Sequence, residues 1–313
     1  MMRFLVIRFF RGLLTLFLVL SFAFLILRST GDPAMLIMSA EAPPEALEAF
    51  RKGWGLDAPL WQQYLGYFKN LAHGHFGYSM RDKSPAMELV LARIPATLTL
   101  ALPAFALKLL IGIAAGVYAA LHRNTWIDRF LISMSIAGYT MPSFVLGLVL
   151  VLIFAVGLGW LPSGGDATWQ HAILPVITLS LGGAAVLARF TRSAMLEVMG
   201  QPYIRTASAK GLVWHRVVLH HAMPNAAIPT LTVIGFMIGS LIAGAVVVES
   251  VFSWPGVGRL LVTSVANRDL AVVQSLLLLV ATTMVTANLV VDILYGWIDP
   301  RVRTGQAAQG KTV

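Results

Sequence analysis

Cysteine is absent from this chain of 313 residues, and charged residues are scarce. Without cysteine the chain cannot be a disulfide-stabilised scaffold. Charged residues make up 12% of the sequence, whereas a soluble domain carries roughly 25%. Too few charges remain to cover a soluble body of this size, and a hydrophobic content of 58% excludes disorder. The composition therefore indicates a membrane protein.

Segments of about ten residues with alternating hydrophobicity are also missing, so the membrane spans are predicted to be helices rather than barrel strands. A helix needs about 20 mostly apolar residues to cross a bilayer core. Six stretches satisfy this requirement, the fourth being the shortest. They are Phe4 to Leu27, Pro95 to Leu121, Phe130 to Val156, Ile173 to Leu187, Ala226 to Val248 and Ala271 to Trp297.

The first stretch follows or includes three arginines, a pattern that is also typical of a cleaved signal peptide. Its apolar run from Gly12 to Leu27 is long for a signal-peptide core, and no clean cleavage site follows it. We therefore interpret this stretch as an uncleaved span.

The net charge of +9 has two interpretations. In a soluble protein it would suggest nucleic-acid binding, but in a membrane protein it reflects an excess of Lys and Arg in cytoplasmic loops. Thirteen of the 23 basic residues lie in segments on the side of the two termini, whereas the long segment after the first stretch has equal numbers of both signs. We expect six transmembrane helices with both termini in the cytoplasm.

The spans predict three parts of the chain. Residues 1–94 contain the first span and a hydrophilic outer segment with a short helix from Pro44 to Arg51. Residues 95–300 form a five-helix core, interrupted at about 189–225 by a basic cytoplasmic loop whose length suggests a docking surface. Residues 301–313 form a flexible tail.

The tail matches the phosphate-binding pattern G-x-x-x-x-G-K-[ST]. We interpret the match as chance, because the pattern works only between a strand and a helix and a single residue follows it. It consists of Gly305, Gly310, Lys311 and Thr312.

Metal and catalytic sites are not expected either. His73, His75, His220 and His221 have no acidic or Cys neighbours at ligand spacing. No paired catalytic groups occur inside the spans, which argues against an intramembrane enzyme.

Charged residues within or beside the spans are better candidates for function, because a charge in the bilayer is costly. Lys108 falls near the middle of the second stretch and Glu249 ends the fifth. Lys108 either lines a cavity that faces a polar solute, or it has a structural role in a buried pair or as a side chain that snorkels to the interface. The sequence leaves both interpretations open. Gly112 with Gly116, and Gly235 with Gly239, have the spacing that allows helices to approach closely.

The basic loop carries a resemblance. Arg205-Thr206-Ala207, three residues, Gly211, nine residues and then His221-Ala222-Met223-Pro224 resemble the E-A-A-x3-G-x9-I-x-L-P motif of bacterial ABC importer permeases. The stretch from Tyr203 to Gly211 is similar to the dipeptide, oligopeptide and nickel branch. The stretches G-D-P-A from Gly31, G-W-L-P from Gly159 and E-S-V-F-S-W-P-G-V-G-R-L from Glu249 agree with that branch, and the long outer segment resembles its B-type subunit. His75 and Lys108 depart from the family pattern.

The resemblance implies an all-α type I importer permease in the bacterial inner membrane that is not itself an enzyme. Its partners would be a second homologous permease, two cytoplasmic ATPases that hold ATP and Mg, and a periplasmic solute-binding protein. The residues implied to couple to the ATPase are Tyr203, Arg205, Thr206, Ala207, Lys210, Gly211 and Pro224, while Lys108 and Glu249 are candidates for the translocation path. Peptides, glutathione and nickel chelates remain open as substrates, and the alternative function is a secondary transporter or channel that needs no ATPase.

Overall fold

A computed structural model describes all residues of the chain except 1, 30, 32, 39–41, 242 and 299–313. Its α-helices are α1 (Met2–Ser29), α2 (Pro33–Ile37), α3 (Pro44–Gly53), α4 (Leu60–Ala72), α5 (Ala86–Leu121), α6 (Trp126–Thr140), α7 (Ser143–Leu150), α8 (Ile173–Met199), α9 (Pro202–Ala209), α10 (Trp214–Val217), α11 (Met223–Gly239), α12 (Val246–Val251), α13 (Val257–Ala266) and α14 (Leu270–Ile298). Shorter segments are the π-helices η1 (Val151–Gly157) and η3 (Val218–Ala222) and the 3₁₀ helices η2 (Trp169–Ala172) and η4 (Ala243–Ala245).

Five of the described helical segments are long and apolar enough to cross a membrane, which confirms the predicted all-helical membrane fold. A sixth span exists if α6 and the segment Ser143–Gly157 together count as one. The five segments are Val6–Ser29, Ala86–Leu121, Trp169–Met199, Trp214–Gly239 and Leu270–Val291. The short outer helix predicted at Pro44 is also confirmed as α3.

The third predicted span is not one straight helix. Helix α6 ends at Thr140, and the helical segment Ser143–Gly157 that follows it is bent by 104° relative to α6. Met141 is extended, with φ −77° and ψ 120°, because the ring of Pro142 disfavours the helical conformation of the residue before it. The Met141-Pro142 pair was the sequence signal for this break.

Two other boundaries also differ from the prediction. Helix α8 continues to Met199, so the first eleven residues assigned to the basic loop are helical. The fifth span ends at Gly239 rather than at Val248, and α12 starts anew at Val246. Glycines at 239 and 244 lower helix propensity there.

The described chain forms two compact units, which we consider separately. One unit comprises Leu98–Trp254 and the described residues from Met284 on, and the other comprises the described residues of Met2–Thr97 and Pro255–Thr283. The predicted division at residues 94 and 300 describes roles rather than contacts, and it stays a prediction.

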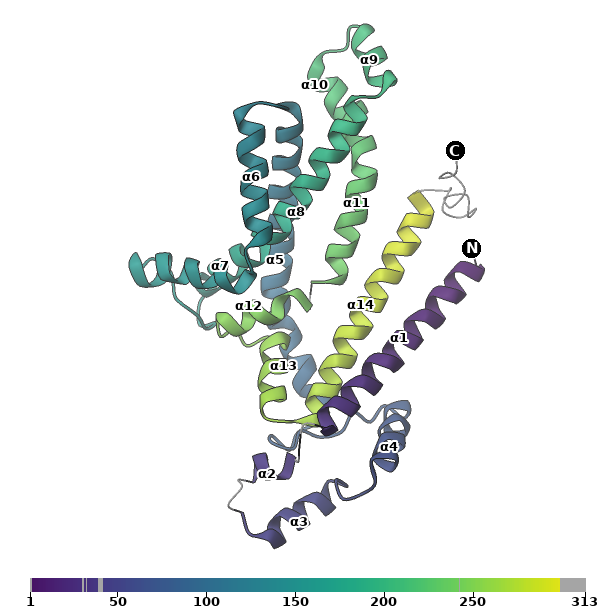
Figure 1. Cartoon of the computed structure of the whole chain (residues 1–313), viewed down its shortest axis with the longest axis vertical. Helices are drawn as coiled ribbons and strands as arrows, with labels where there is room; N and C mark the ends of the chain where they lie inside the picture. The colour runs from purple at the N-terminus through teal and green to yellow at the C-terminus, as the bar shows by residue number, and fades with distance from the viewer. Residues whose placement is uncertain (1, 30, 32, 39–41, 242, 299–313) are drawn as a thin grey trace. The chain divides into compact units, whose positions relative to one another are not determined.

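In the first unit, α8 lies between α6 and α11 (Figure 1). The packing is close because glycines replace larger side chains where helices meet. A Cβ on Gly112 would lie 2.8 Å from Cβ of Leu187 on α8, and a Cβ on Gly235 would lie 2.6 Å from Val291 on α14. Both predicted glycine pairs therefore lie at helix contacts.

In the second unit, aromatic side chains join α4 to α1. The ring centroids of Phe24 and Tyr64 are 5.4 Å apart, and those of Phe17 and Phe68 are 5.3 Å apart. Tyr64 Oη also lies 2.8 Å from Ser21 Oγ. Burial in this cluster raises the pKa of Tyr67 to about 12, because an ionised phenol is disfavoured away from water.

The outer segment of the second unit is also tied to the start of α14. Ser79 Oγ donates a hydrogen bond to the carboxylate of Asp269, and the Met80 N–H donates to the same carboxylate at 3.3 Å. Met80 then packs with Leu27, Leu270 and Val273 in one apolar cluster.

Candidate functional site

Helix α9 and its cap form the centre of the predicted coupling loop. Gly200 ends α8, and Pro202 occupies the first turn of α9, where its missing N–H is not needed. At the other end the Lys210 N–H donates to the Thr206 carbonyl at 3.1 Å, and the Gly211 N–H donates to the Ser208 carbonyl at 3.0 Å. Gly211 has φ +80°, the left-handed conformation that commonly ends a helix and that glycine adopts without a steric cost.

One face of α9 is anchored in a buried apolar cluster. Ile204 and Ala207 are buried, three residues apart on the same helix face. They pack with Met195 of α8 and Val217 of α10, and the cluster extends to Ala120 at the end of α5. Helix α9 is therefore joined by side-chain packing to the ends of several membrane helices.

The opposite side of the loop is exposed. Tyr203 is 43% exposed, Val213 60% and Trp214 52%, and large apolar side chains on a solvent-facing loop are typical of a binding surface. Basic side chains accompany them, and the stretch from residue 200 to 222 contains no Asp or Glu. We call this exposed apolar and basic surface the α9 surface; it comprises Tyr203, Arg205, Thr206, Lys210, Leu212, Val213 and Trp214.

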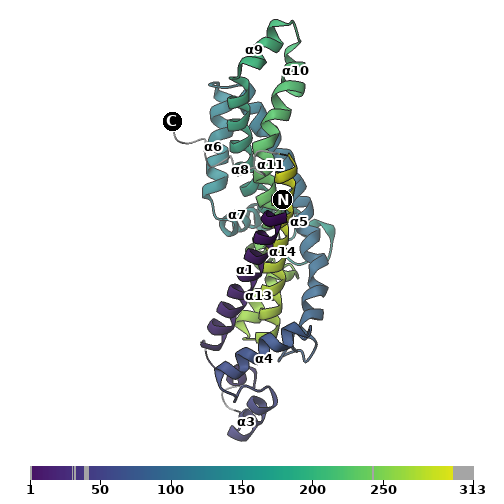
Figure 2. The same ribbon diagram turned by 90° about the vertical axis from the view of Figure 1, so that its right-hand side faces the viewer.

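The α9 surface includes some of the residues implied by the motif, while others lie elsewhere. Tyr203, Arg205, Thr206 and Lys210 are exposed on the surface. Ala207 is buried under α9 and belongs to the anchor. Pro224 lies in the first turn of α11, beyond α10 and η3, at the other end of the loop. Figure 2 shows α9 and α10 together at one end of α8 and α11.

Lys108 lies on the side of α5 that packs against α8. It precedes Gly112 and Gly116 by one and two turns, and so shares their face. A Cβ on Gly183 of α8 would overlap the methylene chain of Lys108, so this glycine makes the space that the lysine occupies. Lys108 is half-buried, and within the described part of the chain no hydrogen bond or ion pair of its ammonium group is found.

Glu249 occupies a different environment from the one expected. The sequence placed it at the membrane end of the fifth span, but it is fully buried in the short helix α12. Its neighbours Val248 and Phe252 form an apolar cluster with Leu174 of α8. A solute could reach Glu249 only if the packing around α12 opened.

The comparisons with known proteins decide the family. A model of the binding-protein-dependent transport system inner membrane component matches residues 112–304, and a model of the N-terminal part of such components matches residues 1–101. The chain belongs to this permease family.

Relatives agree over almost the whole length of the permease. The glutathione transport system permease protein GsiC of Escherichia coli strain K12 is 44% identical over 290 residues, which cover 92% of this chain and 95% of that protein. GsiC of Shigella boydii serotype 4 strain Sb227 is 43% identical over the same coverage.

Among solved structures, the inward-facing MetNI methionine ABC transporter matches with a TM-score of 0.59. The match covers 69% of this permease and 98% of that chain at 18% identity, so it supports the fold alone. Together the comparisons confirm the predicted identity as a multi-pass inner-membrane permease subunit of an ATP-driven importer.

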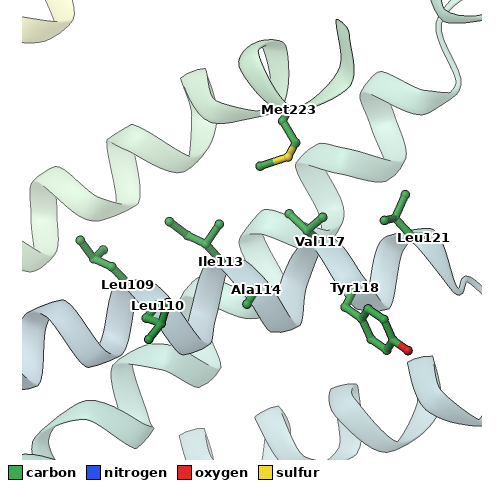
Figure 3. Close-up of a pocket in the computed structure, with 8 residues that line it drawn as sticks. All are labelled: Leu109, Leu110, Ile113, Ala114, Val117, Tyr118, Leu121 and Met223. Carbon is green, nitrogen blue, oxygen red and sulfur yellow. The ribbon is translucent and has the colours of Figure 1, made fainter. Parts of the chain in front are cut away.

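An apolar groove of about 520 Å³ runs along the permease's α5. Leu109, Ile113 and Val117 point toward the side of Met223, which closes the groove from α11, while Tyr118 points away (Figure 3). The groove offers no charged group, so it does not supply the contacts that a polar solute needs. Although Leu109 follows Lys108 directly, Lys108 itself does not line the groove.

The phosphate-loop match at Gly305 to Thr312 lies outside the described residues. Within the described residues, no three His, Asp or Glu side chains gather where they could hold a metal ion.

An ion pair that the sequence reasoning missed lies near the α9 surface, at the same end of α8. Arg192 donates from Nε to Oδ1 of Asp128 at 2.6 Å and from Nη2 to Oδ2 at 2.8 Å. The available signal was the pattern T-x-x-D from Thr125, which marks the first turn of a helix and places Asp128 at the start of α6.

Proposed function

We propose that this permease imports peptides or closely related small solutes such as glutathione. The support for this substrate class is the 44% identity to the glutathione permease over nearly the full length of both chains. A tripeptide of this kind carries carboxylates and an amine, so its passage requires a path with polar or charged groups rather than the apolar groove on α5.

The complete importer in this proposal has five subunits. This permease pairs with a second homologous permease, two cytoplasmic ATPases bind below them, and a periplasmic solute-binding protein delivers the solute. ATP and Mg are held by the ATPases, and the permease itself performs no catalysis and binds no cofactor.

The observation that carries the proposal is the α9 surface. Tyr203, Val213 and Trp214 are exposed although they are large and apolar, as expected of side chains that fit into a groove of another protein. The Arg and Lys side chains of the same surface favour an acidic rim around that groove. Residues Tyr203, Arg205, Thr206 and Lys210 would contact the ATPase, and Ala207, Gly211 and Pro224 would shape the loop.

The anchor under α9 explains how a motion would be transmitted. Because Ile204 and Ala207 are packed against α8 and α10, a displacement of α9 carries the adjacent helix ends with it. Closure of the ATPases on ATP would then rock these helices between two packings and expose the path to alternate sides of the membrane.

Lys108 and Glu249 remain our candidates for the path. A half-buried ammonium group in the middle of a span favours a solute with a carboxylate. Glu249 would take part only in a conformation in which the cluster of Val248 and Phe252 has opened.

A single experiment tests the proposal at the level of the complex. The tagged permease is purified in mild detergent from cells that express its native partners, and is then reconstituted into vesicles. We expect an ATPase to copurify, and uptake of radiolabelled glutathione or dialanine to require ATP inside the compartment where the ATPase lies. Uptake that proceeds without any ATPase and collapses with an ionophore would instead establish a secondary transporter.

A further inference from the structure

Asp128 joins three parts of the cytoplasmic end of the first unit. Its two carboxylate oxygens accept the bidentate pair from Arg192 of α8, and Oδ2 also accepts the Asn124 N–H at 3.0 Å. Thr125 Oγ1 accepts the Asp128 N–H at 3.4 Å and so caps α6. One carboxylate thereby fixes the turn after α5, the start of α6 and the side of α8.

Partial burial gives this pair a desolvation cost. The Asp128 side chain is 5% exposed and that of Arg192 is 25% exposed. Even a fully buried ion pair can often be replaced by apolar side chains without loss of stability, so stability alone does not explain a part-buried pair with this geometry. The planar guanidinium in a two-bond contact holds direction as well as distance.

The pair joins the bent span, through α6, to α8, the helix on which α9 is anchored. Arg192 precedes Ala194 and Met195, which belong to the cluster that anchors α9. At its other end α6 touches α8 through Gly138, where a Cβ would lie 3.4 Å from Cβ of Ala185. Beyond the 104° bend, Leu150 and Val151 pack against the cluster that contains Val248 and Phe252.

We propose that Asp128 and Arg192 are a positioning pair that makes α6 move with α8 when the ATPases act on α9. The proposal rests on the function proposed above. Without the pair, α6 would keep its packing at Gly138 but lose the directed contact at the end nearest α9. Displacement of α9 would then reach α8 without moving the bent span in step, and ATP would be hydrolysed with less solute carried.

The functional test uses the complete reconstituted complex, with glutathione and dialanine as probes. Asp128→Asn and Arg192→Gln should each lower the solute carried per ATP by about tenfold, and the double variant should be no worse than either single one, because both remove the same contact. ATP hydrolysis and assembly should stay within about twofold of wild type. Arg189→Gln is the control, since Arg189 lies one turn earlier on α8 and contacts the Tyr139 ring of α6 at 5.2 Å.

The outcomes separate the two proposals. Two results would each overturn the positioning role. One is an unchanged ratio of solute carried to ATP hydrolysed, including the case in which both fall in proportion. The other is additive effects of the two substitutions. The wild-type complex is measured first, and uptake by it without an ATPase would overturn the proposed function instead.

The absence of cysteine allows a structural test as well. Spin labels are placed on the exposed residues Ser133 of α6 and Ser193 of α8. In the wild type the distance between the two labels should be the same in the nucleotide-free and the vanadate-trapped complex. In Asp128→Asn the distribution of this distance should broaden on trapping. A wild-type change of about one helical turn, roughly 5 Å, would show that the two helices do not move together.

Discussion

Gly211 is the residue that gives the predicted coupling loop its shape. Its φ of +80° turns the chain directly after α9, and no other heavy atom would lie within 4 Å of an added Cβ. The demand on this position is therefore conformational rather than steric. The left-handed conformation costs an ordinary residue roughly 1–2 kcal/mol, whereas glycine and, to a smaller extent, asparagine adopt it readily.

This difference predicts opposite outcomes for two substitutions. Gly211→Val should lower uptake by about tenfold, because a β-branched residue strains the turn that presents the α9 surface. Gly211→Asn should keep most of the activity. Uptake of labelled glutathione is measured together with the amount of permease in the membrane. Equal loss in both variants would mean that the loop needs open space at this position and not the left-handed turn.

At the scale of elements, the packing of α5 on α8 decides how closely the spans approach. A Cβ on Gly116 would lie 2.6 Å from the Ala188 carbonyl oxygen and 2.6 Å from Cβ of Thr191. Backbone and a β-carbon cannot swing aside as the end of a long side chain can. The two helices must therefore separate if this glycine is replaced.

Gly116→Ala should accordingly destabilise the permease by about 1–3 kcal/mol, as overpacking does elsewhere. Gly66→Ala is the matched control, because Gly66 lies within α4 and nothing lies within 4 Å of its added Cβ. There the gain in helix propensity should leave stability unchanged or raise it by about 0.5–1 kcal/mol. Thermal unfolding of the purified protein in detergent measures both, and a stable Gly116→Ala variant would show that the contact is loose.

The elements also show where sequence reasoning was reliable. Long apolar stretches predicted the spans, because burial in lipid requires helices of a fixed minimum length. The turn at Met141-Pro142 and the end of α11 at Gly239 do not follow from the number of apolar residues. Backbone geometry at a proline or glycine does not change an apolar count, although both residues were visible in the sequence.

At the scale of the whole molecule, the distribution of basic residues is the remaining source of information on orientation. Thirteen of the 23 Lys and Arg residues lie in segments that the predicted topology assigns to the cytoplasm, and the α9 surface lies among them. The predicted topology places both termini and the α9 surface on the cytoplasmic side.

Reporter fusions test this orientation. Gly74 ends the turn after α4 in an open position with φ +76°. Alkaline phosphatase inserted at this residue should be active, because the predicted topology places it on the periplasmic side. Green fluorescent protein at the C-terminus should be fluorescent because it stays in the cytoplasm. Active phosphatase at the C-terminus would reverse the orientation and exclude contact between the α9 surface and a cytoplasmic ATPase.

The sequence by itself determined that the protein is embedded in a membrane, how many apolar stretches it has, and to which family it belongs. These follow from composition, length and the spacing of motif residues along the chain. It also predicted most of the α9 surface, because that surface is continuous in sequence. The tertiary structure alone decided which side of α9 is anchored, that Glu249 is buried, that Lys108 passes over Gly183, and that Asp128 meets Arg192 across 64 positions. Contacts between distant residues depend on helix packing and direction, and a linear pattern contains neither.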